Sequence, residues 1–315
     1  SAAAAPMSAL AMSDDVGASM HAFAARLYPL FRSITGDGLR ATLRAIGEHI
    51  PLELHEVPSG TPVFDWEVPR EWNIRSAWIR DSRGCTIADI AHSNLQVVSY
   101  SVPVHATLSL AELRPRLHCV RGRPDWIPYR TAYYADDWGF CLPERVLDGL
   151  AEDRYEVMID STLAPGHLTY GECVLPGREA DEVLVSCHVC HPSLANDNTS
   201  GMAVATALAE WIAGESRRYT YRFVFAPGTI GSLCWLHANQ ADLHRVKAGL
   251  VLGLLGDAGG LTYKASRDEN TWTDAVGRYV VEQGVGGGRT VPFSPYGYDE
   301  RQLCSPGFNL PVGRL

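Results

Sequence analysis

The sequence lacks the features that mark membrane proteins and nucleic-acid-binding proteins. No apolar run reaches the ~18 residues that span a bilayer, because the longest candidates, such as 248–255, stop at Gly and Asp. The net charge is −9, and no run of like charge is long enough to form a patch for nucleic acid or anionic lipid. We therefore expect neither a nucleic acid nor a membrane as a partner.

Signals for export and dense disulfides are also missing. The first thirteen residues are rich in Ala and contain no Lys or Arg, unlike a signal peptide. The eight cysteines are spread along the chain without the density of a secreted disulfide framework. These observations predict a cytoplasmic protein in which residues 1–16 form a disordered lead-in.

The composition favours a large globular core, since 46% of the 315 residues are apolar and 20% are charged. Residues 17–50 show helical spacing of apolar positions, whereas residues 58–115 are alternating, aromatic and punctuated by Pro. We therefore predict a small inserted β-rich domain at 58–115, within a discontinuous α/β domain formed by 17–57 and 116–315.

The second half of the chain alternates strands and helices. Apolar strands are expected at 182–187, 221–225 and 248–255, and helices at 200–213, 231–240 and 271–283. This order predicts βαβ units around a largely parallel sheet with helices on both faces, a three-layer α/β/α fold. Ligands of such sheets bind beyond the carboxyl ends of the strands.

Residues 187–201 (CHVCHPSLANDNTSG) follow the first of these strands and admit several interpretations. The CxxCH pattern matches a haem-attachment motif, but it continues a buried strand in a chain without an export signal. A structural zinc knuckle would need a second close ligand pair. A thiol nucleophile at Cys187 or Cys190, activated by a neighbouring His, stays as a minor alternative.

The interpretation that we favour is a hydrolytic metal site. His188 ends a strand, Asp197 follows nine residues later before a helix, and Asp257 follows another strand. Taken singly, Asp197 could be only a helix cap and Asp257 only a turn residue. Together they predict His188, Asp197 and Asp257 as metal ligands.

Seven segments carry a resemblance to a known family: 30–38, 64–74, 99–105, 168–172, 188–201, 227–232 and 293–311. They resemble the aminopeptidase-like branch of the zinc-dependent M28 peptidases, and specifically the bacterial DUF4910 group with an inserted DUF2172 domain. The resemblance implies an aminopeptidase-like fold and zinc as cofactor. It matches His188 to the first zinc ligand, Asp197 to the bridging Asp and Asp257 to the later Asp.

Other parts of the M28 pattern do not carry over. Gly228 and Thr229 stand where M28 enzymes have paired glutamates, one of which is the general base, and the distal His would fall beyond Arg314. Hydrolysis still needs a positioned acid or base. The substitute candidates for this catalytic role are His191, Glu172 and Asp299.

The predicted function is metal-dependent hydrolysis of an amide bond, with a small peptide or amide conjugate as substrate. One alternative is a catalytically impaired protein that keeps the fold as a ligand-binding or assembly module, because Gly228 and Thr229 replace the glutamates. A further alternative is a thiol-dependent acyl transferase. The sequence leaves homo-oligomer formation open.

Overall fold

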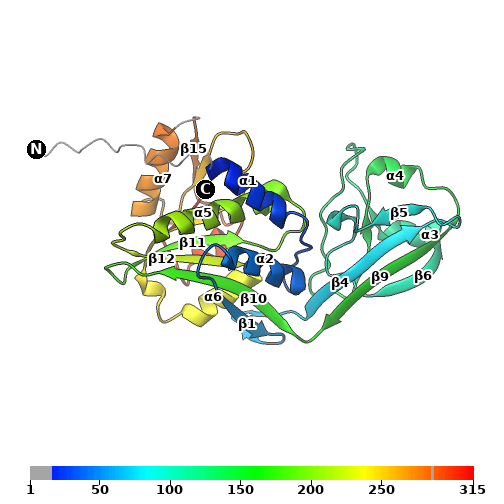
Figure 1. Ribbon diagram of the computed structural model, residues 1–315, viewed down its shortest axis with the longest axis horizontal. Helices are drawn as coiled ribbons and strands as arrows, with labels where there is room; N and C mark the ends of the chain where they lie inside the picture. Colours follow the sequence, from blue (N-terminus) through cyan, green and yellow to red (C-terminus); the bar gives the residue numbers. More distant parts are fainter. Residues whose placement is uncertain (1–15, 285–286) are drawn as a thin grey trace, which may run out of the picture.

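The computed structural model describes residues 16–284 and 287–315 and has two lobes (Figure 1). The predicted lead-in at 1–16 lies, except for Val16, outside the described residues. The larger lobe contains an eight-stranded sheet, and the smaller lobe is built on a four-stranded sheet. Among the described helices, none has the length and apolar character needed to cross a membrane.

The eight-stranded sheet has the order β1-β10-β12-β11-β13-β16-β14-β15. Its strands are β1 (Glu53–Pro58), β10 (His167–Leu175), β12 (Thr220–Ala226), β11 (Glu182–His188), β13 (Val246–Leu252), β16 (Val312–Arg314), β14 (Thr262–Lys264) and β15 (Arg289–Val291). The four strands β12, β11, β13 and β16 are parallel, whereas β1 and β10 pair in antiparallel fashion. The largely parallel centre confirms the predicted α/β fold class.

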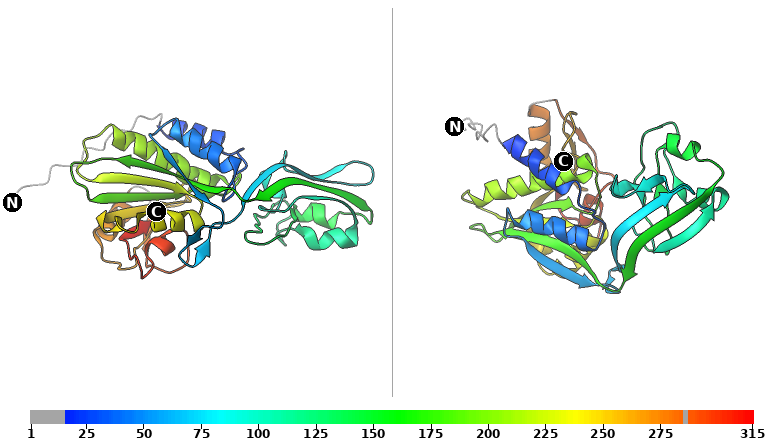
Figure 2. Two further views of the ribbon diagram at one scale, coloured as in Figure 1. Left: turned by 90° about the horizontal axis from the view of Figure 1, so that it is seen from below. Right: turned by 45° about the vertical axis from the view of Figure 1, so that its right-hand side comes forward.

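Helices cover both faces of this sheet (Figure 2). They are α1 (Val16–Leu27), α2 (Asp37–Gly47), α5 (Gly201–Ala213), α6 (Ile230–Asn239), α7 (Trp272–Gln283) and α8 (Glu300–Leu303). Successive side chains of β11 point to opposite faces of the sheet, so the strand contributes to two apolar clusters. Val185 and Cys187 belong to the cluster with α1, α2 and α5, and Leu184 belongs to the cluster with α6 and α8. The arrangement is the predicted three-layer α/β/α sandwich.

The smaller lobe is a sheet of order β5-β4-β9-β6 with its own apolar core. Its strands are β5 (Thr86–Asp89), β4 (Glu71–Arg80), β9 (Arg154–Ala164) and β6 (Val104–Ser109), accompanied by α3 (Leu110–Leu113) and α4 (Glu144–Asp148). Shorter elements are β2 (Pro62–Val63), β3 (Trp66–Glu67), β7 (Leu117–His118), β8 (Phe140–Cys141), η1 (Asn94–Gln96), η2 (Arg114–Arg116), η3 (Ala195–Ser200) and η4 (Leu243–Arg245).

The sheet of the smaller lobe extends beyond the boundary expected at residue 115. Strand β9 pairs with both β4 and β6, so residues up to Ala164 contribute to it. Its buried residues Tyr155, Val157 and Ile159 alternate with more exposed ones. This alternation would suit a strand of the eight-stranded sheet as well as one of the four-stranded sheet. Sequence alternation predicts a strand here but not its partners. A separately folding β-rich domain in this region stays a proposal.

Candidate metal centre

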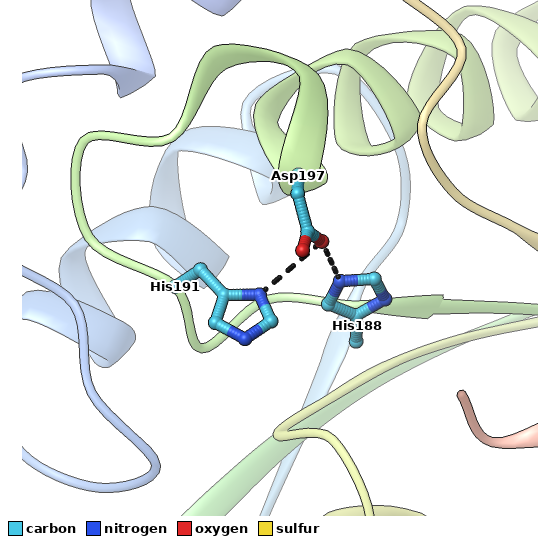
Figure 3. Close-up of side chains that lie close together, drawn as sticks. All are labelled: His188, His191 and Asp197. Atoms are coloured by element: carbon cyan, nitrogen blue, oxygen red, sulfur yellow. Dashed lines mark hydrogen bonds and ion pairs between the residues drawn. The ribbon is translucent and has the colours of Figure 1, made fainter. Parts of the chain in front are cut away.

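Three side chains with metal-binding atoms meet where β11 ends, as Figure 3 shows. His188 is the last residue of β11, His191 lies in the following loop, and Asp197 lies in the short helical segment η3 before α5. One ligand atom of each residue lies within 4.8 Å of the other two. The described residues contain no other group of three or more His, Cys, Asp and Glu side chains that meets this criterion.

The distances within the cluster suit a metal ion that takes the place of a proton. His188 Nε2 lies 2.6 Å from Asp197 Oδ1, and His191 Nδ1 lies 3.4 Å from the same oxygen. Two ligands of one tetrahedral zinc ion lie about 3.4 Å apart, given bonds of about 2.1 Å. The His191 separation already matches this value. The shorter contact is a hydrogen bond that would lengthen when a metal replaces the shared proton.

Burial distinguishes the three residues. The His188 side chain is 0% exposed, whereas those of His191 and Asp197 are 18% and 28% exposed. His191 Nδ1 is buried, and its contact with Asp197 Oδ1 at 3.4 Å lacks the geometry of a hydrogen bond. A ligand at this nitrogen would satisfy it better than the long contact does. The donor set of two imidazoles and one carboxylate therefore fits zinc, and two of the three residues are partly exposed.

The charge of Asp197 is stabilised within this cluster. Burial by itself raises the pKa of this carboxyl group, but the contacts with His188 and His191 outweigh burial and hold the pKa well below its ordinary value. The carboxylate is therefore ionised at neutral pH, as a metal ligand must be.

Neighbouring side chains hold the ligands in place. The Tyr298 hydroxyl donates to Asp197 Oδ2 at 2.8 Å, and its ring stacks on His188 with centroids 4.5 Å apart. Asn198 Nδ2 lies 3.2 Å from His188 Nδ1, and buried Arg32 donates to the His191 carbonyl at 3.0 Å. Such contacts fix the orientation of metal ligands and tune their affinity. Sequence reasoning did not assign Tyr298, Asn198 or Arg32 to the site.

The smaller lobe also reaches the cluster. The Tyr129 ring contacts His191 edge to face with centroids 5.1 Å apart, and Asn94 Nδ2 donates to Ser193 Oγ at 2.9 Å. Tyr129 therefore lies directly beside one of the candidate ligands.

Asp257 does not join the cluster. Its side chain is exposed, and Asn196 Nδ2 donates to Asp257 Oδ2 at 3.0 Å. The Gly259 amide donates to Asp257 Oδ1 at 2.7 Å, which is the geometry of a turn residue. The structure therefore does not support the prediction of Asp257 as a ligand. The third residue of the cluster is instead His191, from the loop after β11.

Glu172 lies elsewhere. It is on β10, which is separated from β11 by β12, and it forms an ion pair with Arg222 at 2.8 Å. Trp235 Nε1 donates to Glu172 Oε1 at 2.7 Å. These contacts make Glu172 part of a structural network on another part of the sheet, so its position does not suit the predicted catalytic role.

Asp299 is buried beside the segment that replaces the M28 glutamates. The Thr229 amide donates to Asp299 Oδ1 at 2.8 Å, while Oδ2 has no partner among the described residues. Burial raises the pKa of this carboxyl group. Of the three predicted acid or base candidates, Asp299 alone combines a carboxylate oxygen without a hydrogen-bond partner with a place next to Gly228 and Thr229.

Burial makes the thiols of Cys187 and Cys190 unreactive. Cys187 is 1% and Cys190 is 4% exposed. Burial raises the pKa of Cys190 to about 12 and that of Cys187 further. Because the thiolate is the nucleophile, neither residue is poised for acyl transfer.

Comparisons with known proteins agree with this architecture. A curated protein of Clostridium acetobutylicum, named "Putative polysaccharide biosynthesis protein with aminopeptidase-like domain", is 47% identical over 303 residues, which is 96% of this chain and 70% of that protein. The crystal structure of a "putative peptidase" from Clostridium acetobutylicum is 46% identical, with a TM-score of 0.94 over 95% of this chain and 71% of that one.

More distant structures share the fold. A zinc aminopeptidase from Bacillus subtilis has a TM-score of 0.64 at 11% identity, over 95% of this chain and 83% of that one. A peptidase M28 precursor from Shewanella amazonensis has a TM-score of 0.60 at 13% identity, over 96% and 85%. The fold is therefore aminopeptidase-like.

One family covers nearly the whole chain. Residues 21–315 match the family described as "Domain of unknown function (DUF4910)", and the chain belongs to this family.

Proposed function

We propose that this member of the DUF4910 family is a zinc-dependent hydrolase of amide bonds that acts on a small peptide or amide conjugate. The observation that carries the proposal is the cluster of His188, His191 and Asp197, in which both imidazoles face one oxygen of Asp197. The zinc aminopeptidase from Bacillus subtilis, which has the same fold, supports zinc as the metal.

The three ligand residues would hold the ion on the side of the sheet where the strands end. A bound zinc ion would polarise the amide carbonyl and acidify the attacking water. Tyr298 keeps one oxygen of Asp197 occupied and leaves the other to face both imidazoles. The chain thus presents two nitrogens and one oxygen in an arrangement that is set before the metal binds.

Asp299 is the residue that we propose as proton acceptor and donor. Its raised pKa brings it nearer to neutrality, where a carboxyl group exchanges protons more effectively. Its free oxygen, Oδ2, lies beside a segment whose usual base is replaced by Gly228. We expect slow turnover compared with M28 enzymes, because Gly228 and Thr229 stand in the place of the paired glutamates.

Metal content tests the first half of the proposal. Full-length protein prepared without chelators should contain about one equivalent of zinc, and His188→Ala and His191→Ala should each contain much less. His92→Ala is the matched control, because His92 is an exposed histidine of the smaller lobe. Less than a tenth of an equivalent in the unmodified protein, even after zinc is supplied, would contradict the proposal.

Hydrolysis tests the second half. A panel of aminoacyl amides, dipeptides and N-acyl amides should show slow, chelator-sensitive cleavage that Asp299→Asn reduces by about a hundredfold or more. Zinc binding without cleavage of any amide would favour the second candidate, a ligand-binding module. The observation behind that candidate is Gly228, which has no side chain at the usual base position.

We also propose that the smaller lobe corresponds to the inserted DUF2172 domain. The separate core around β4, β6 and β9 and the antiparallel sheet support this assignment. Its contact with His191 through Tyr129 gives it a role in shaping the substrate cleft.

A further inference from the structure

Arg32 is a buried cation without an anionic partner. Its side chain is 0% exposed, although arginine is almost never fully buried unless it is paired. Burial lowers the pKa of Arg32 to about 10, so the guanidinium group still carries its charge at neutral pH. Within residues 16–284 and 287–315, no carboxylate lies at ion-pair distance from this group. Its hydrogen bonds in this part of the chain go to neutral oxygen atoms.

These oxygen atoms belong to parts of the chain that are far apart in sequence. Arg32 Nε donates to the His191 carbonyl at 3.0 Å, and Nη2 donates to Thr199 Oγ1 at 3.4 Å. On the other side, Nη1 donates to the carbonyl of Leu27, the last residue of α1, and to Thr42 Oγ1 in α2 at 3.5 Å. The guanidinium group therefore joins α1 and α2 to the loop after β11.

That loop carries two of the three candidate metal ligands. Residues 191–199, which we call the site loop, contain both His191 and Asp197 (Figure 3). Arg32 contacts the first and the last residue of the site loop, so its two contacts lie on either side of Asp197. A displacement of the guanidinium group would therefore move the His191 backbone, and with it the imidazole, relative to the Asp197 carboxylate.

The segment that carries Arg32 is itself held in place by buried hydroxyl groups. Ser33 Oγ lies 2.7 Å from Ser99 Oγ, and Thr35 Oγ1 lies 2.6 Å from the Tyr100 hydroxyl. All four of these residues are at most 2% exposed. Arg32 therefore extends from a fixed backbone and can act as a rigid support for the site loop.

The choice of residue at position 32 indicates a role beyond stability. A buried cation without a counterion lowers stability, and an apolar residue of similar volume would cost the fold less. The guanidinium group, however, has five N–H donors in a fixed plane, so it bonds to several oxygen atoms at once in a way that Lys cannot. Residues that break such a rule are expected at functional sites. The contacts with His191 and Thr199 place Arg32 beside one.

We propose that Arg32 is a positioning residue of the candidate metal centre, which holds the site loop so that the His191 imidazole faces Asp197. The inference rests on the proposed function and adds to it a residue outside the ligand set. In this role Arg32 contacts neither metal nor substrate, and it acts through the backbone of His191 and the side chain of Thr199. Because these contacts exist before a metal binds, their effect is measurable in the metal-free protein.

The metal-free full chain tests the proposal without requiring zinc or hydrolysis. Arg32→Lys keeps the charge but loses the planar fork. In this variant the His191 ring signals in NMR spectra should move, and amide exchange of residues 189–194 should become about tenfold faster or more. A purely structural role would lower the free energy of unfolding in urea and leave the His191 signals of the folded protein in place. Unchanged signals and exchange rates in folded Arg32→Lys would overturn the proposal.

Two threonines provide a matched pair that leaves the buried charge intact. Thr199 and Thr42 are both buried, and each Oγ1 accepts from the same guanidinium group, but only Thr199 belongs to the site loop. Thr199→Val should move the His191 signals in the same direction as Arg32→Lys, whereas Thr42→Val should leave them unchanged. Equal changes in the two threonine variants would overturn the proposal, even if Arg32→Lys does not fold.

Zinc binding separates this inference from the proposed function. Arg32→Lys should raise the dissociation constant for zinc by about 10- to 100-fold and alter the visible spectrum of the cobalt-substituted protein, which reports ligand geometry. If the His191 signals depend on Arg32 but the unmodified protein binds no zinc, the positioning role stands and the hydrolase proposal fails. If the unmodified protein and Arg32→Lys bind zinc equally well and share one cobalt spectrum, the positioning role fails and the hydrolase proposal stands.

Discussion

Gly228→Glu should increase amide hydrolysis, since it returns a carboxylate to the position where the resembling M28 enzymes carry their general base. A Cβ atom fits there. A Cβ atom at Gly228 would lie 3.6 Å from Cys190 Sγ and 3.8 Å from His188 Cβ, which are ordinary van der Waals distances. The Gly228 backbone is outside the left-handed region, so the substitution brings no backbone strain.

The magnitude follows from the value of a positioned base. General acid–base catalysis contributes about 10²- to 10⁴-fold in rate, or roughly 3 to 5 kcal/mol of transition-state free energy. Asp299 already supplies part of this in the proposed mechanism. We therefore expect the lower part of the range, a rise in kcat/KM of about a hundredfold for Gly228→Glu.

The assay compares three proteins with zinc content measured in each. Gly228→Gln is the matched control, because it has the size of Glu and cannot accept a proton. It should leave the rate near that of the unmodified protein. In the Gly228→Glu background, Asp299→Asn should reduce the rate less than it does alone, because two bases that serve one proton are not additive.

Two results would refute the reasoning. An equal rise with Gln and Glu would show that volume rather than a base was missing. An unchanged rate in Gly228→Glu at full zinc occupancy would show that position 228 does not face the reacting groups.

Three further predictions concern the thiols, pH and folding. Cys187→Ser and Cys190→Ser should keep metal-dependent hydrolysis largely intact, because both thiols are buried with raised pKa values; loss of rate at constant zinc content would revive the acyl-transfer alternative. Asp274→Asn should make the free energy of unfolding depend less on pH in acid. Burial raises the pKa of Asp274, but hydrogen bonds outweigh burial and hold the pKa at about 2, so a contribution of about 2 kcal/mol is present above pH ~4 and is lost as the pH falls towards 2. An unchanged slope of stability against pH in acid denaturation would contradict this. Glu172→Gln should lower the free energy of unfolding in urea by about 1 to 2 kcal/mol at unchanged zinc content, because Arg222 loses one ion pair but keeps its pair with Glu182. Loss of zinc instead would return Glu172 to the site.

Much of the architecture follows from local sequence pattern. The strands expected at 182–187 and 221–225 and the helices expected at 200–213, 231–240 and 271–283 lie within a residue or so of β11, β12, α5, α6 and α7. The short elements β14, β15, β16 and α8 have too few residues for a periodic pattern and were not predicted. Sequence pattern also predicts a helix over 110–118, but α3 ends at Leu113 and a 3₁₀ turn with Pro115 follows. His188 and Asp197 were paired from the strand-to-helix order alone, since the carboxyl end of a strand and the start of the next helix are adjacent in a βαβ unit.

The sequence by itself therefore determined the α/β/α layers and the place of the site at the end of β11. Only the tertiary structure decided that His191 rather than Asp257 completes the cluster, that β9 joins the smaller sheet, and that Tyr298 reaches Asp197 from 101 residues away. The periodicity of apolar residues shows which face of a helix or strand is buried, and this face can be identified from the local sequence. The path of a loop, the choice of strand partner and the meeting of distant side chains depend on how the whole chain packs, which no local pattern specifies.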